Sequence, residues 1–154
     1  MSFSSDILKK FSSTPTPFYH YDLKLLSRTI DALKKESDQY GYHVHYALKA
    51  NANDEILSVI KKAGLGADCV SGNEVKKAAE HGFEKIFFAG VGKSDAEINT
   101  GLDKNISCFN CESLQEIEII NQLAKTKDKI APIAFRINPN VNANTHKYIT
   151  TGLE

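Results

Sequence analysis

The chain has 154 residues, 42% of them hydrophobic and 25% charged, and its 19 basic and 19 acidic side chains give a formal net charge of zero. This composition is typical of one ordinary globular domain, and the neutral charge gives no indication of a nucleic-acid or membrane-surface partner. We expect no signal peptide and no membrane span, and the odd number of cysteines, three, argues against a secreted disulfide framework, so we expect a cytoplasmic protein.

The first 17 residues are rich in Ser, Thr and Pro. The Thr-Pro repeat at residues 14–17 favours extended backbone, so we expect residues 1–17 to form an extended segment that precedes the main domain, residues 18–154. The aromatic residues 18–21 predict a strand. Asp22 is a good N-cap, and apolar residues at helical spacing after it predict a helix that ends near residues 40–41.

From there the sequence alternates between apolar segments and amphipathic helical patterns. The apolar segments begin about 20 to 25 residues apart, which suits βα units. The predicted strands are 44–48, 66–70, 85–89, 106–110 and 131–137, and the predicted helices are 54–63, 71–81, 94–102 and 113–125.

Three of these helices begin with Ser-x-x-Glu, a spacing at which hydroxyl and carboxylate satisfy free backbone donors of the first turn. The pairs are Ser71/Glu74, Ser94/Glu97 and Ser113/Glu116. Strand–helix alternation predicts an α/β fold with a parallel sheet, either open or closed into a barrel. No Gly-x-Gly-x-x-Gly follows the first predicted strand, which argues against a dinucleotide-binding fold. About five of the eight units of a (β/α)8 barrel fit into the chain.

Lys49 lies where the first predicted strand meets a loop that begins at Asn51. In (β/α)8 barrels this end of a strand carries the active site. Apolar surroundings lower the pKa of a lysine, and the neutral amine forms an imine with a carbonyl. The simpler alternative is a lysine that emerges into water at a strand end, and the position alone favours it.

Asp68 and Arg136 are charged residues inside predicted apolar strands, where each needs a partner. In a barrel alternate strand residues point inward, so Asp68 and Lys49 would approach each other across neighbouring strands. Together with Arg136 they would suit an anionic cofactor. A structural Asp68–Arg136 ion pair explains both residues equally well.

Two other motifs suggest sites that we do not predict. Gly90–Ser94 resembles the end of a nucleotide P-loop, but Phe87 stands where that motif needs its first glycine. Cys108 and Cys111 form a C-x-x-C pair, but along a strand their Cα atoms would be roughly 10 Å apart, beyond disulfide range. We therefore expect a buried, structural Cys108.

The five histidines are scattered, and only His43 and His45 share a predicted strand face. A two-histidine metal site needs a third ligand, which the spacing does not offer, so no metal site is predicted.

Tyr46-Ala47-Leu48-Lys49-Ala50-Asn51 closely resembles the cofactor-lysine motif of the fold type III, alanine-racemase-like pyridoxal-phosphate decarboxylases. Residues 67–74 look like the segment that follows in that family. The segments that resemble the diaminopimelate decarboxylase subgroup are 17–22, 136–141, Thr145-His146 and 149–152. The resemblance covers the chain from about Thr16 to its last residue.

The resemblance implies a (β/α)8 barrel, of which about the first five units are present, and a β-domain that is largely missing and against which residues 1–17 would pack. It implies that Lys49 binds pyridoxal 5'-phosphate covalently and that Asp68 and Arg136 line the cofactor pocket, with Ala47 and Ser71 as further cofactor-binding positions. Glu74 also matches, although helix capping already explains it together with Ser71. His146 matches the subgroup without a role that we can assign.

The implied reaction is decarboxylation of meso-2,6-diaminopimelate to L-lysine and CO2, by a homodimer. Other members of the family, such as arginine, ornithine or carboxynorspermidine decarboxylases, remain alternatives, as do a pyridoxal-phosphate homeostasis protein and a non-catalytic regulator. The family's phosphate-binding loop and its pyridine-partner glutamate would lie beyond Glu154, so we expect the 154 residues alone to be inactive. Cys111-Glu112-Ser113 imitates a later family motif, and we interpret it as a coincidence around a helix cap.

Overall fold

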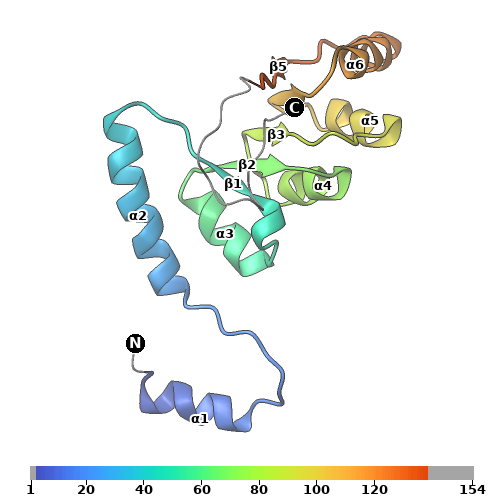
Figure 1. Cartoon of the computed structure of the whole chain (residues 1–154). Coiled ribbons are helices and arrows are strands. Elements are labelled where there is room, and N and C mark those ends of the chain that lie inside the picture. The colour runs from blue at the N-terminus through green and yellow to red at the C-terminus, as the bar shows by residue number, and fades with distance from the viewer. Residues whose placement is uncertain (1–2, 139–154) are drawn as a thin grey trace.

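The computed structural model describes residues 3–138 and contains the predicted alternation of strands and helices (Figure 1). Observed boundaries differ from the predicted ones by a few residues; Leu48, for example, leaves the first strand and enters a 3₁₀ turn, η1. The strands are β1 (His45–Ala47), β2 (Gly66–Cys69), β3 (Ile86–Phe88), β4 (Cys108–Cys111) and β5 (Ile133–Phe135). The helical elements are α1 (Ser5–Ser13), α2 (Leu23–Gln39), η1 (Leu48–Ala50), α3 (Asp54–Lys62), α4 (Gly72–Glu80), α5 (Asp95–Asp103) and α6 (Leu114–Thr126).

The five strands form one parallel sheet in the order β1-β2-β3-β4-β5. Every strand therefore pairs with the next strand along the chain. This is the order of a (β/α)8 barrel, whereas a doubly wound open sheet reverses its order at a switch point. The strand order decides between the two alternatives that the sequence left open, in favour of the first five units of a barrel.

Helices α3 to α6 contribute buried residues to the core on one face of the sheet, where Figure 1 shows α4, α5 and α6 stacked beside one another. Under them lies a core of buried apolar residues from alternate strand positions. Gly101 in α5 shows how close this packing is, because a Cβ atom there would lie 2.7 Å from Cζ of Phe109 in β4. The strand residues of this core are Ala67, Cys69, Ile86, Phe88, Phe109 and Cys111.

The opposite face of the sheet carries the remaining strand positions. In a parallel ladder, residues paired in register point to the same face. The register joins Ala47 to Asp68, Asp68 to Phe87 and Phe87 to Cys108. These four residues form one row across β1–β4, on the face that would become the interior of a closed barrel.

The N-terminal region differs from the prediction in two ways. Residues 5–13 form helix α1 where we expected extended backbone, because Ser4 caps the helix and Phe11 packs against Phe18 and His20 at ring distances of 5.3 and 5.0 Å. The strand predicted at residues 18–21 is wrong, since these residues adopt no regular structure and pair with no strand of the described chain. Asp22 caps α2 as predicted, accepting a hydrogen bond from the amide of Leu25 at 2.9 Å.

All three cysteines are buried and free. Cys108 and Cys111 lie on opposite faces of β4, so their thiols point apart. Burial raises the pKa of the Cys69 thiol to about 12. Within residues 3–138 no helix is long and apolar enough to cross a bilayer.

Candidate active site

Lys49 occupies the middle of the turn η1, directly after the carboxyl end of β1. Three local hydrogen bonds hold this segment in place. The hydroxyl of Tyr46 donates to the carbonyl of Asn51 at 2.9 Å, the side chain of Asn51 accepts from the amide of Asn53 at 2.9 Å, and the side chain of Asn53 accepts from the amide of Glu55 at the start of α3. The polar residues around Lys49 therefore fix the backbone on both sides of it.

The Lys49 side chain is exposed and makes no ion pair or hydrogen bond within the described residues. Within the described residues Lys49 thus has no apolar surroundings and emerges at the strand end, which is the alternative that its position alone favoured. By contrast, Leu48 beside it is fully buried and anchors the turn in the core. Lys49 therefore presents its amine from a turn anchored by Leu48, at the strand end where barrels carry their active sites.

Asp68 lies in the middle of β2, half-buried, on the face of the sheet that the helices leave open. Its register partner in β1 is Ala47, two residues before Lys49. The structure therefore places Asp68, Ala47 and the Lys49 turn on neighbouring strands, and their joint role in a cofactor pocket stays a prediction. The Asp68 carboxylate acts electrostatically on His45, where it partly opposes the burial that lowers the pKa of that histidine.

Arg136 follows β5, at the opposite edge of the sheet from β1. Its amide donates to the carbonyl of Cys111 at 2.9 Å, so the β4–β5 ladder continues to this residue. Its guanidinium forms an ion pair with Glu112, at 3.2 Å from Nη1 to Oε2. A structural Asp68–Arg136 pair, which we weighed from the sequence, is therefore wrong, because the partner of Arg136 is Glu112.

Sequence analysis missed the importance of Glu112 and of Lys93. Lys93 follows β3 in the segment that resembles a P-loop, yet its side chain is only 1% exposed and its amine is paired with Glu116 at 2.6 Å. Glu112 follows β4 directly, so both residues lie at strand carboxyl ends. The sequence signal for these two residues was their position after predicted strands. For Lys93 a further signal was the acidic residue Glu116 in α6, which reaches its amine.

Ser71 caps α4, accepting a hydrogen bond from the amide of Glu74 at 3.3 Å. The Glu74 carboxylate accepts from the amide of Val70, one residue earlier than in a standard capping box. Both residues therefore shape the β2–α4 loop. At α5 the Glu97 carboxylate accepts from the amide of Ser94 at 3.1 Å, as a capping box requires of its acidic residue, and also from the Ser94 hydroxyl at 2.9 Å.

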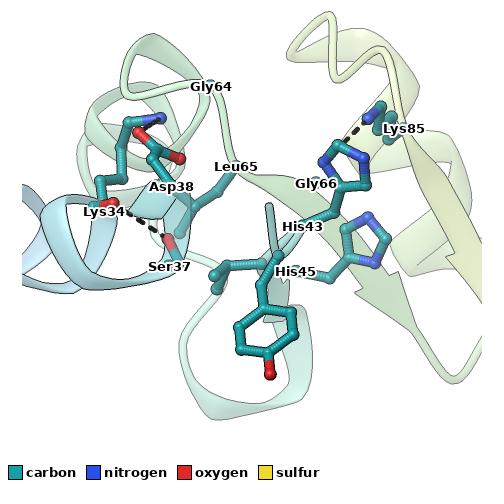
Figure 2. Close-up of a pocket in the computed structure, with 11 residues that line it drawn as sticks. Lys34, Ser37, Asp38, His43, His45, Gly64, Leu65, Gly66 and Lys85 are labelled. Carbon is teal, nitrogen blue, oxygen red and sulfur yellow. Dashed lines mark hydrogen bonds and ion pairs between the residues drawn. The ribbon is translucent and has the colours of Figure 1, made fainter. Parts of the chain in front are cut away.

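A hollow of about 70 Å³ lies at the other end of the sheet, where β1 and β2 begin (Figure 2). Figure 2 shows His43 near Lys85, with 3.4 Å between Nδ1 and Nζ, and His45 beside them. The His45 ring packs against Phe87 in a tilted arrangement with centroids 4.3 Å apart, and its buried Nε2 has no hydrogen-bond partner among residues 3–138. Within residues 3–138 no three His, Cys, Asp or Glu side chains are grouped as metal ligands.

Several residues of the resemblance lie outside the described residues. They are the segments 139–141 and 149–152 together with Thr145 and His146. The described part of the candidate site therefore consists of Lys49 and Ala47 from β1 and its turn, Asp68 and Ser71 from β2 and its loop, and Arg136 after β5.

Comparison with known proteins identifies the family. Residues 23–154 match the family model described as the pyridoxal binding domain of pyridoxal-dependent decarboxylases. A curated diaminopimelate decarboxylase from Bacteroides thetaiotaomicron is 55% identical over 149 residues, which are 95% of this chain and 39% of the relative. One from Helicobacter pylori is 42% identical over 94% of this chain and 36% of its own length.

The solved structures agree. The crystal structure of diaminopimelate decarboxylase from Helicobacter pylori in complex with L-lysine superposes with a TM-score of 0.87 at 40% identity, over 96% of this chain and 38% of that one. The chain spans less than two fifths of the length of these relatives. From the parallel sheet, the lysine turn and these matches, we conclude that the chain belongs to the pyridoxal-dependent decarboxylases and forms part of their pyridoxal-binding domain.

Proposed function

We propose that the protein containing this chain is a pyridoxal 5'-phosphate-dependent decarboxylase. The observation that carries the proposal is the Lys49 amine, which is unpaired among the described residues and lies at the carboxyl end of β1, in a chain that belongs to a pyridoxal-binding family. A lysine amine that forms no ion pair needs only to lose a proton to attack an aldehyde carbon. The turn fixes the backbone of Lys49, so that its amine is presented at this end of β1.

The described residues fit the cofactor in charge and position. Lys49 would hold it covalently, and the guanidinium of Arg136 would offer positive charge to an anionic group. Asp68 and Ala47 would form the wall beside Lys49, with Ser71 at the neighbouring strand end. When bound, the cofactor supplies an electron-accepting ring that takes up the electron pair released as a carboxylate leaves as CO2.

For the substrate we propose meso-2,6-diaminopimelate, with L-lysine and CO2 as products. The curated relatives at 40–55% identity are diaminopimelate decarboxylases, and a solved relative is in complex with L-lysine. We also propose a cytoplasmic location, which the three free, buried cysteines support. A homodimer is proposed from the resemblance to the family alone.

The cofactor site is tested by treating the full-length protein with pyridoxal phosphate and then with borohydride, which reduces the link to a stable amine. Peptide mass mapping should find the added pyridoxyl group on Lys49, and Lys49→Ala should abolish it. Lys62→Ala, which changes another exposed lysine, serves as the control. A label that persists in Lys49→Ala at another lysine would refute the assignment.

The reaction is tested separately, by measuring CO2 and amine products with diaminopimelate, arginine and ornithine as substrates. We expect lysine to form from diaminopimelate and neither of the other two substrates to be consumed at a comparable rate. Cofactor binding at Lys49 without any decarboxylation would instead identify a pyridoxal-phosphate homeostasis protein.

A further inference from the structure

The side chain of Lys93 joins the carboxyl ends of two strands. Its ammonium group donates to the carbonyl of Gly90 after β3 and to the carbonyl of Asn110 in β4, both at 2.8 Å. Its third hydrogen bond goes to the carboxylate of Glu116 in α6 at 2.6 Å. All three donors of the ammonium group are thus used, which makes a buried lysine tolerable.

This arrangement depends on the backbone at Gly90. Its φ of 105° lies in a region that side chains with a Cβ atom rarely adopt, so glycine is the residue that suits the turn. The carbonyl of Gly90 accepts from Lys93, and its amide donates to the Glu112 carboxylate at 3.4 Å. Gly90 therefore contacts both the ammonium group of Lys93 and the carboxylate of Glu112.

A second set of contacts extends this hydrogen-bond network from Glu116 to Arg136, which follows β5. The other oxygen of Glu116 accepts from the amide of Glu112 at 2.7 Å, which fixes the backbone of that residue. The Glu112 carboxylate, 11% exposed, then pairs with the Arg136 guanidinium, which is 58% exposed. An ion pair with one such exposed partner is weak by itself, because water screens it. The position of the Glu112–Arg136 pair is fixed by the buried part of the network, which is Lys93 with Glu116.

We propose that Lys93 is a positioning residue for the cofactor site: through Glu116 and Glu112 it sets where Arg136 is held at the strand ends. The proposal rests on the proposed function, in which Arg136 contacts the cofactor. Without Lys93, the ends of β3 and β4 lose their shared donor, and the Glu112 carboxylate is no longer held at a fixed distance from β5. The simpler alternative is that Lys93 only stabilises the fold.

The test uses three variants of the full-length protein and measures the affinity of each apoprotein for pyridoxal phosphate by titration. The first is Lys93→Met with Glu116→Gln, which removes both buried charges so that none is left unpaired. The second is Arg136→Gln, and the third combines all three changes. Lys127→Met with Asp103→Asn, which removes an ion pair of a half-buried and an exposed side chain at the ends of α6 and α5, is the matched control.

We expect the first variant to bind pyridoxal phosphate about tenfold more weakly, as for other groups that orient a ligand-binding side chain. If Lys93 acts through Arg136, the combined variant binds no more weakly than Arg136→Gln alone. The control should bind like the wild type. Circular dichroism at the titration temperature confirms that each variant is folded, and Lys93→Gln with Glu116→Gln replaces the first variant if methionine is not tolerated.

Two outcomes would overturn the positioning role and leave the proposed function intact. Losses of affinity that multiply in the combined variant would show that Lys93 and Arg136 act independently. A lower melting temperature of the first variant with unchanged affinity would show a role in stability alone. A wild-type protein that binds no cofactor would refute the proposed function, and the positioning role with it, and is distinguished from both by the wild-type titration.

Discussion

Gly66 is the position where one added methyl group should have the clearest effect on this fold. It begins β2 and pairs in register with His45 of β1. A Cβ atom on residue 66 would lie 1.9 Å from Cδ2 of His45, whereas ordinary contact begins at 3.4 Å. The imidazole would therefore have to move by about 1.5 Å, and the ring of Phe87, at a centroid distance of 4.3 Å, already packs against it.

We expect Gly66→Ala to lower the free energy of unfolding by about 1–3 kcal/mol, the usual cost of overpacking a filled site. The measurement is urea unfolding of the full-length protein followed by circular dichroism. Gly92→Ala is the matched control, because a Cβ atom there meets nothing within 4 Å. That control should be neutral or slightly stabilising, since alanine restricts the unfolded chain.

The cause is tested by combining Gly66→Ala with His45→Ala. If the conflict is with the imidazole, the added methyl group should cost far less in the His45→Ala background than in the wild type. An equal cost in both backgrounds would refute the argument and would point to the backbone of β2. An unchanged stability of Gly66→Ala itself would show that the His45 ring is not held between Gly66 and Phe87.

Three further predictions follow from the same structure. Burial lowers the pKa of His45 below 6.5, so the unfolded chain binds a proton at this residue more readily than the folded chain does. The resulting loss of stability should begin as the pH falls below 6.5. In urea unfolding, His45→Gln should show a shallower decline of stability than the wild type between about pH 7.5 and 5.5. The thiols of Cys69, Cys108 and Cys111 are buried with raised pKa values, so Ellman's reagent should react with them only after denaturation, and rapid reaction of the native protein would contradict this. Tyr46→Phe removes the hydrogen bond to the carbonyl of Asn51 and should cost about 1 kcal/mol of unfolding free energy, with slower borohydride trapping at Lys49; unchanged trapping would mean that the turn is held without this bond.

The sequence determined the local elements of this protein. The alternation of apolar segments and helical patterns predicted all five strands and the helices between them, because each pattern repeats within a few residues. The position of Lys49 at the end of β1 could also be predicted from the sequence, because the turn depends on near neighbours of Lys49, namely Tyr46, Asn51 and Asn53. The failure at residues 18–21 marks the limit of this reasoning, because a strand forms only where another strand pairs with it.

Only the tertiary structure decided how distant residues combine. Arg136 pairs with Glu112, 24 residues earlier, because the β4–β5 register brings the two strand ends together. Lys93 is buried because Glu116, 23 residues later, reaches it from α6. Neither pairing leaves a periodic signal, since the spacing between partners depends on loop lengths and strand register. The order of the strands, which separates a barrel from an open sheet, is set in the same way, by contacts between units that have similar sequence patterns.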